Sequence, residues 1–192
     1  SYLVQSPPFC VCDGMVGHAA GEVASSIAVE TIAKTAPQAA DAARLAAAVE
    51  AANAAVIEAA LNGLGKPGMG CTATCAYIEN DMLAIAHVGD SRAYLLHEGT
   101  LIRVTRDHSY VEELVDAGEI TADEARGHPN RSVITRALGS DPAMYADHFT
   151  LHVEEGDRLI LCSDGLSSMI PDSDIENIAT QSSTCLLYTS DA

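Results

Sequence analysis

Two periodicities in the hydrophobic pattern divide this chain into helical and extended parts. In residues 19–35 and 41–62, apolar side chains recur at spacings of three and four, which predicts two helices that each bury one face. Pro37 ends the first helix, and Asp41 is placed to cap the second. We expect both helices to pack on a sheet.

Short apolar runs bounded by turn residues predict strands in much of the remaining chain. Because several runs follow each other through short turns such as Glu98-Gly99, we expect antiparallel pairing. The last two runs are expected to pair with each other as a hairpin across Glu155-Gly156-Asp157. With helices before and after the strands, the fold class is α+β. The predicted strands are residues 9–12, 71–78, 82–88, 92–96, 101–105, 149–153 and 158–162.

Residues 107–132 differ from the core elements because charged side chains dominate and the apolar face is thin. Two capping-box patterns, Ser109-x-x-Glu112 and Thr121-x-x-Glu124, each predict the start of a short helix. We therefore interpret this segment as a small helical flap on the surface.

The two ends of the chain also depart from the pattern. Residues 1–8 are interpreted as a connection, since they contain Pro7-Pro8. Residues 182–192 continue no helical period and are interpreted as a tail that is not native to the domain. Residues 1–181 then form one domain.

Size and charge narrow the classes of function. The chain has 192 residues, of which 48% are hydrophobic, enough for one domain with a substantial core. No apolar run approaches the roughly 18 residues of a membrane span, so we expect no membrane segment in this chain. The net charge of −17 argues against binding to nucleic acid and is compatible with binding cations.

The cysteines indicate a reducing compartment. None of them forms a Cys-x-x-Cys pair, and most lie in apolar, strand-like contexts, which favours buried free thiols over disulfides or zinc ligands. We therefore predict a cytoplasmic location. The cysteines are Cys10, Cys12, Cys71, Cys75, Cys162 and Cys185.

Three acids far apart in sequence each follow an apolar run and adjoin glycine. They are Asp13 before Gly14, Asp90 after Gly89, and Asp164 before Gly165. Taken alone, Asp13 fits a helix cap or an Asx turn as well as a metal ligand. Three carboxylates at strand ends are the ligands that a shared site for hard cations needs, which favours the metal site.

The segments around these acids resemble motifs of the bacterial PPM-type protein phosphatases, the metal-dependent type-two-C serine/threonine group. The resemblance covers residues 9–180, with the motifs in family order. They are Asp13-Gly14-Met15-x-Gly17-His18-Ala19-Ala20-Gly21-Glu22-Val23-Ala24-Ser25, Gly68-Met69-Gly70-Cys71-Thr72-Ala73, Ala86-His87-Val88-Gly89-Asp90-Ser91-Arg92-Ala93-Tyr94-Leu95, Thr105-Arg106-Asp107-His108-Ser109, Val133-Ile134-Thr135-Arg136-Ala137-Leu138-Gly139 and Leu161-Cys162-Ser163-Asp164-Gly165-Leu166.

The resemblance implies a fold and a set of site residues. The family fold consists of two antiparallel β-sheets sandwiched between α-helices. Its site holds two Mn²⁺ or Mg²⁺ ions, with a third in bacterial members. Carried over, Asp13 bridges two ions, the Gly14 carbonyl binds the second and Asp164 binds the first, while Asp90 and Asp164 hold the third. Asp13 and Asp164 are thus the expected catalytic residues, and residues 107–132 the flap beside the cleft.

The chain also departs from the family pattern. Further family carboxylates are expected before residue 1 and beyond residue 180, so the domain is expected to be incomplete at both termini. Val16 occupies a position where the family usually has Gly, and a β-branched residue there would be strained if the backbone required a positive φ. The alternative is therefore an inactive PPM-like binding or regulatory module.

Several further expectations concern the setting. The leading hypothesis is a bacterial signalling hydrolase that dephosphorylates phosphoserine and phosphothreonine in proteins and opposes a cognate kinase. We expect it to act as a monomer. Among the other polar residues, His87 and His108 are expected to be structural, and Arg92 and Arg136 to form ion pairs rather than to bind phosphate.

Overall fold

The computed structural model describes residues 1–3, 7–15 and 17–181. Its helices are α1 (His18–Thr35), α2 (Ala42–Leu61), α3 (Tyr110–Asp116), α4 (Ala122–Gly127), α5 (Asp164–Ser167) and α6 (Asp172–Gln181). Its strands are β1 (Tyr2–Leu3), β2 (Phe9–Val11), β3 (Gly14–Met15), β4 (Gly70–Cys71), β5 (Ala73–Glu79), β6 (Met82–Val88), β7 (Arg92–His97), β8 (Thr100–Arg103), β9 (Asp147–His152) and β10 (Arg158–Cys162).

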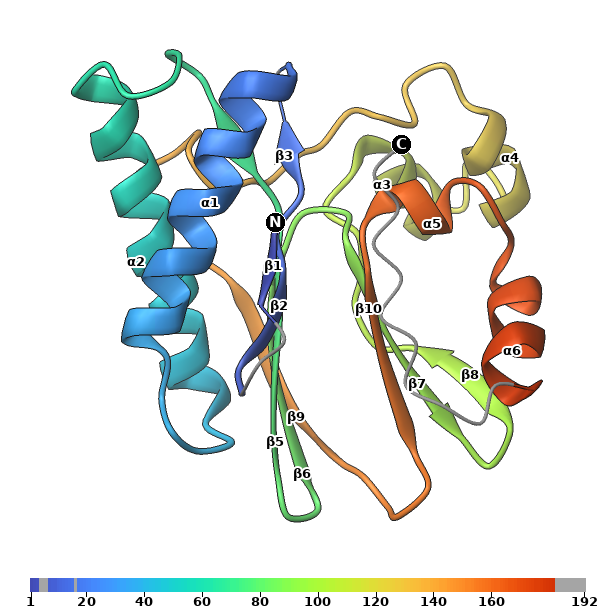
Figure 1. Ribbon diagram of the computed structural model, residues 1–192. Coiled ribbons are helices and arrows are strands. Elements are labelled where there is room, and N and C mark those ends of the chain that lie inside the picture. The colour runs from blue at the N-terminus through green and yellow to red at the C-terminus, as the bar shows by residue number, and fades with distance from the viewer. Residues whose placement is uncertain (4–6, 16, 182–192) are drawn as a thin grey trace.

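The strands form two main antiparallel sheets. The first has five strands in the order β1-β2-β5-β6-β9, and the second has three in the order β10-β7-β8. The short strands β3 and β4 pair separately beside them. In Figure 1, α1 and α2 cover the outer side of the first sheet, while α6 lies by the second sheet and α3, α4 and α5 gather near one end of it. The result is a layered α+β sandwich.

Two apolar layers hold the sandwich together. One lies between α1, α2 and the first sheet, and many of its buried side chains are alanines, which let the two helices approach closely. Asp41 caps α2 as predicted, because its carboxylate accepts a hydrogen bond from the Arg44 N–H at 3.0 Å. The other layer lies between the sheets and includes Leu83 and Ile85 of β6 and Leu95 of β7.

The predicted hairpin between residues 149–153 and 158–162 is wrong. β9 pairs with β6 of the first sheet, whereas β10 pairs with β7 of the second. The physical reason is that Phe149 and Leu159 both pack into the layer between the sheets. The connection at Glu155-Gly156-Asp157 therefore crosses from one sheet to the other. Residues 1–8 are also more than a connection, because β1 pairs with β2 at the edge of the first sheet.

The segment from 107 to 132 contains the two short helices that its capping patterns predict. The Ser109 hydroxyl accepts a hydrogen bond from the Glu112 N–H at the start of α3, and Thr121 and Glu124 form a reciprocal capping box on α4. No residue of α4 is buried, which agrees with a surface position.

Two sequence expectations fall on residues outside the described part of the chain, namely the strain at Val16 and the nature of residues 182–192. Across residues 1–3, 7–15 and 17–181, no helix is both long enough and apolar enough to cross a membrane.

Candidate metal centre

Each of the three candidate acids follows a strand, and these strands belong to both sheets. Asp13 follows β2, Asp90 lies in the connection from β6 to β7, and Asp164 begins α5 directly after β10. In Figure 1, β3, the β6–β7 connection and α5 lie toward the same end of the sandwich. The strand register thus delivers carboxylates from residues far apart in sequence to one region.

Electrostatic interactions show that these acids are neighbours. Burial raises the pKa of Asp13 to about 6, assisted by a side-chain hydrogen bond to Asp164 and by the charge of that carboxylate. Asp90 is 8% exposed, and burial together with the charges of Asp164 and Asp107 raises its pKa to about 7. The surroundings therefore do not fully stabilise the negative charges of Asp13 and Asp90, and these two carboxyl groups stay partly protonated near neutral pH.

The donor set fits a hard divalent cation. Carboxylate oxygens are the ligands that Mg²⁺ and Mn²⁺ prefer, and a cation would offset both the burial of these charges and their mutual repulsion, which together raise the two pKa values. Within the described residues, no three His, Cys, Asp or Glu side chains already surround a point where a metal ion could sit. A bound ion would therefore have to draw the carboxylates of Asp13, Asp90 and Asp164 further together.

Gly14 brings main chain close to Asp13. A Cβ atom at Gly14 would lie 2.3 Å from the Gly21 carbonyl oxygen of α1, so only glycine fits between the loop and the helix. Gly14 also pairs with Cys71 across β3 and β4. Packing and pairing together fix the backbone beside Asp13.

The sequence pattern did not predict the hydroxyl groups of Thr72 and Ser91, which lie beside the backbone of the acids. The Asp13 N–H donates to Thr72 Oγ1 at 3.0 Å, and Thr72 Oγ1 lies 2.7 Å from Ser91 Oγ. Both Thr72 and Ser91 stood inside the quoted motifs, but their partners are distant in sequence and no periodicity reveals them.

Both histidines near the acids have structural roles, as expected. His87 is buried, its Nδ1 lies 2.9 Å from Thr74 Oγ1, and burial lowers its pKa to about 3. His108 accepts from the Gly89 N–H through Nδ1 at 3.0 Å, so its proton lies on Nε2, which donates to Asp147 at 3.0 Å. The two neutral rings contribute no positive charge to the acids nearby.

The two arginines form the predicted ion pairs. Arg92 makes a bidentate contact with Asp107, including 2.7 Å from Nη2 to Oδ2, and its side chain is only 18% exposed. Arg136 binds Asp147 at 2.5 Å and stacks on the Tyr145 ring. The cysteine prediction is also confirmed for the described part of the chain. Its buried free thiols are Cys10, Cys12, Cys71, Cys75 and Cys162.

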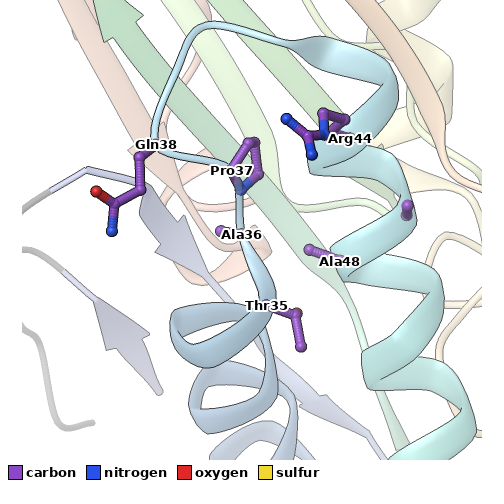
Figure 2. Close-up of a pocket in the computed structure, with 7 residues that line it drawn as sticks. Thr35, Ala36, Pro37, Gln38, Arg44 and Ala48 are labelled. Atoms are coloured by element: carbon purple, nitrogen blue, oxygen red, sulfur yellow. The ribbon is translucent and has the colours of Figure 1, made fainter.

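A separate cleft of about 580 Å³ lies where α1 connects to α2 (Figure 2). Its lining includes Thr35, Pro37 and Arg44 and contains no carboxylate. The acids lie near the start of α1 and this cleft lies at its other end, roughly 27 Å away for 18 helical residues. The cleft is therefore distinct from the candidate metal centre.

Comparisons with known proteins agree with this arrangement. The family described as Protein phosphatase 2C matches residues 5–114, which is more than half of the chain. The chain is 38% identical over 179 residues to the serine/threonine phosphatase stp of Listeria welshimeri, covering 90% of this chain and 71% of that protein. It is 42% identical over 171 residues to the serine/threonine protein phosphatase PstP of Mycobacterium tuberculosis, covering 86% of this chain and 32% of that protein.

Solved structures give the same result. The crystal structure of the Mycobacterium tuberculosis serine/threonine phosphatase PstP superposes with a TM-score of 0.84 at 39% identity, covering 92% of this chain and 76% of that chain. The PstP catalytic domain in complex with two manganese ions superposes with a TM-score of 0.82 at 37% identity, covering 92% of this chain and 75% of that chain.

These findings confirm the predicted family, fold class and enzyme class, and nothing in them favours the alternative of an inactive binding module. The chain belongs to the protein phosphatase 2C family, the PPM-type serine/threonine protein phosphatases.

Proposed function

We propose that this chain is a metal-dependent phosphatase that hydrolyses phosphoserine and phosphothreonine in proteins, with Asp13, Gly14, Asp90 and Asp164 as its metal ligands. The observation that carries the proposal is that three carboxylates lie in one region, where burial and the charge of Asp164 raise the pKa of Asp13 and of Asp90. The manganese ions of the PstP relative agree with the predicted requirement for Mn²⁺ or Mg²⁺.

The position of each residue suggests which metal ion it would bind. Asp13, whose side chain forms a hydrogen bond with Asp164, is assigned to contact two ions. The Gly14 carbonyl and the Asp164 carboxylate would each hold one of these ions. Asp90 and Asp164 are assigned to a third. The proton that Asp13 partly retains near neutral pH in the free protein has to leave when a cation binds, because ligand carboxylates must be ionised.

Bound Mn²⁺ or Mg²⁺ would offset the negative charge of a phosphate ester and lower the pKa of a coordinated water. The chain contributes the geometry that places these ions. The cysteines of the described residues are assigned no part in the reaction, because they are buried thiols. The hydrogen bond with Cys10, together with burial, raises the pKa of Cys12, and burial raises that of Cys71, so these thiols stay protonated.

The segment 107–132 is proposed as the flap that governs substrate access. Two ion pairs support it, one between Arg103 and Glu112 and one between Arg106 and Asp116, which tie α3 to β8 and to the loop that follows. We further propose that the protein acts as a monomer in the bacterial cytoplasm and opposes a cognate serine/threonine kinase in signalling. The bacterial organisms of the relatives support the bacterial part of this proposal.

The test is hydrolysis of p-nitrophenyl phosphate and of a phosphothreonine peptide by the purified chain during a Mn²⁺ titration. We expect turnover that EDTA abolishes and that Asp13→Asn reduces by about 100-fold or more. Asp81→Asn is the matched control, because Asp81 is an exposed acid in the turn between β5 and β6. Mn²⁺-dependent turnover that survives in Asp13→Asn would refute the assignment. A folded wild-type chain without turnover would refute the activity.

A further inference from the structure

Asp13 is bound to Thr72 by a reciprocal pair of hydrogen bonds. The Asp13 N–H donates to the Thr72 hydroxyl at 3.0 Å, and the Thr72 N–H donates to the Asp13 carbonyl at 2.8 Å. Thr72 is 1% exposed and lies between β4 and β5. The backbone of the acid is therefore fixed by the main chain and by the side chain of one buried residue.

The same hydroxyl reaches the loop that carries Asp90. Thr72 Oγ1 lies 2.7 Å from Ser91 Oγ, and Ser91 is fully buried. A threonine hydroxyl can donate once and accept twice, so Thr72 can serve the Asp13 N–H and Ser91 at the same time. The methyl group of Thr72 completes the contact, because a Cβ at Gly89 would lie 2.5 Å from Thr72 Cγ2.

We propose that Thr72 is a positioning residue that locks the Asp13 loop to the Asp90 loop, so that their carboxylates are held close before any cation binds. This inference rests on the proposed metal site. Holding ligands together costs free energy, because the carboxylates repel each other. A buried hydroxyl with two fixed partners supplies that restraint without adding charge. Thr72 contacts no reacting atom itself and acts through the backbone of Asp13 and through Ser91.

Three variants separate positioning from general support of the fold. Thr72→Val keeps the shape of the side chain and removes the hydroxyl, whereas Thr72→Ser keeps the hydroxyl. Thr105→Val is the matched control, because Thr105 is 3% exposed and its hydroxyl likewise accepts a backbone N–H, that of Ala93, at 2.9 Å. Ala93 lies within β7, and its carbonyl accepts from the N–H of Val104, the residue before Thr105, at 2.9 Å, so the backbone at the control site is also held by a main-chain bond.

The measurements are Mn²⁺ binding by isothermal titration calorimetry and thermal unfolding in EDTA. Both valine variants should lower the melting temperature by about 3–8 °C, because each removes the hydroxyl that accepts a backbone N–H inside the protein. Only Thr72→Val should also weaken Mn²⁺ binding, by about tenfold or more, and Thr72→Ser should restore it to within about threefold of wild type.

Equal Mn²⁺ affinity in wild type and Thr72→Val would overturn the proposal, and so would equal weakening in Thr72→Val and Thr105→Val. If Thr72→Val does not fold, Ser91→Ala takes its place, since it cuts only the link to the Asp90 loop. Wild-type affinity in Ser91→Ala would then overturn the proposal. A wild-type chain that binds no Mn²⁺ would overturn the proposed function and this inference together, whereas wild-type binding unaffected by Thr72→Val overturns this inference alone.

Discussion

Replacing Asp90 by asparagine should make the metal-free protein more stable. Asp90 is 8% exposed, and its burial beside Asp164 and Asp107 raises its pKa to about 7. Below pH 4 the carboxyl is protonated in both the folded and the unfolded chain. Between pH 4 and 7 the unfolded chain releases the proton that the folded chain retains, so rising pH destabilises the wild type. Above pH 7 the folded wild type carries the full free-energy cost of the buried, ionised Asp90 carboxylate.

The size of the effect follows from the pKa. A folded pKa of about 7 lies about three pH units above the ordinary value, and each unit corresponds to about 1.4 kcal/mol, so the ceiling is about 4 kcal/mol. Relaxation around the charge reduces this, and we expect Asp90→Asn to gain about 2 kcal/mol at pH 8. For a chain of 192 residues this raises the melting temperature by about 4–8 °C.

The assay is thermal unfolding followed by circular dichroism in EDTA at several pH values between 4 and 8. The matched control is Glu155→Gln, which removes one charge from an exposed turn and should change stability by less than about 0.5 kcal/mol. The gain from Asp90→Asn should grow from pH 4 to 7 and then level off. A variant less stable than wild type at pH 8, or a difference that does not depend on pH, would refute the reasoning. With Mn²⁺ present, wild type should gain more stability than the variant.

Three further predictions test other parts of the structure. Arg92→Met should destabilise the protein by about 3 kcal/mol, because it leaves the buried Asp107 carboxylate without its ion-pair partner. An unchanged denaturant midpoint would disprove that pairing. Gly89→Ala should lose about 2–4 kcal/mol in the same measurement, since Gly89 has a φ of 107° and its new Cβ would collide with Thr72; a gain in stability would contradict the geometry. The five buried cysteines should not react with a thiol reagent in the native protein and should react on unfolding in guanidinium; rapid native labelling of any of them would contradict their burial.

Local pattern was sufficient to predict α1 to α4 and the three acids. The spacing in residues 41–62 defines α2 because one face of that helix is buried along its length, and Asp41 caps it as expected. Asp13, Asp90 and Asp164 could be found because each follows an apolar run and adjoins glycine. This local signal can be recognised without knowing which strands pair.

Long-range pairing was beyond the sequence pattern. Nothing in residues 149–162 distinguishes a hairpin from two strands in opposite sheets, since both arrangements bury the same apolar side chains. The bond from Asp13 to Thr72 joins residues 59 positions apart, and its polar atoms leave no periodic trace. Elements of two to four residues, such as β3 and α5, are too short for any period to reveal.

The central claim is that Asp13, Asp90 and Asp164 hold the metal ions of this phosphatase. The most direct measurement is anomalous diffraction at the manganese edge from crystals of the chain grown with Mn²⁺. We expect anomalous peaks within about 2.0–2.5 Å of carboxylate oxygens of Asp13 and Asp164. Peaks that lie only on surface acids, with none between these two residues, would contradict it.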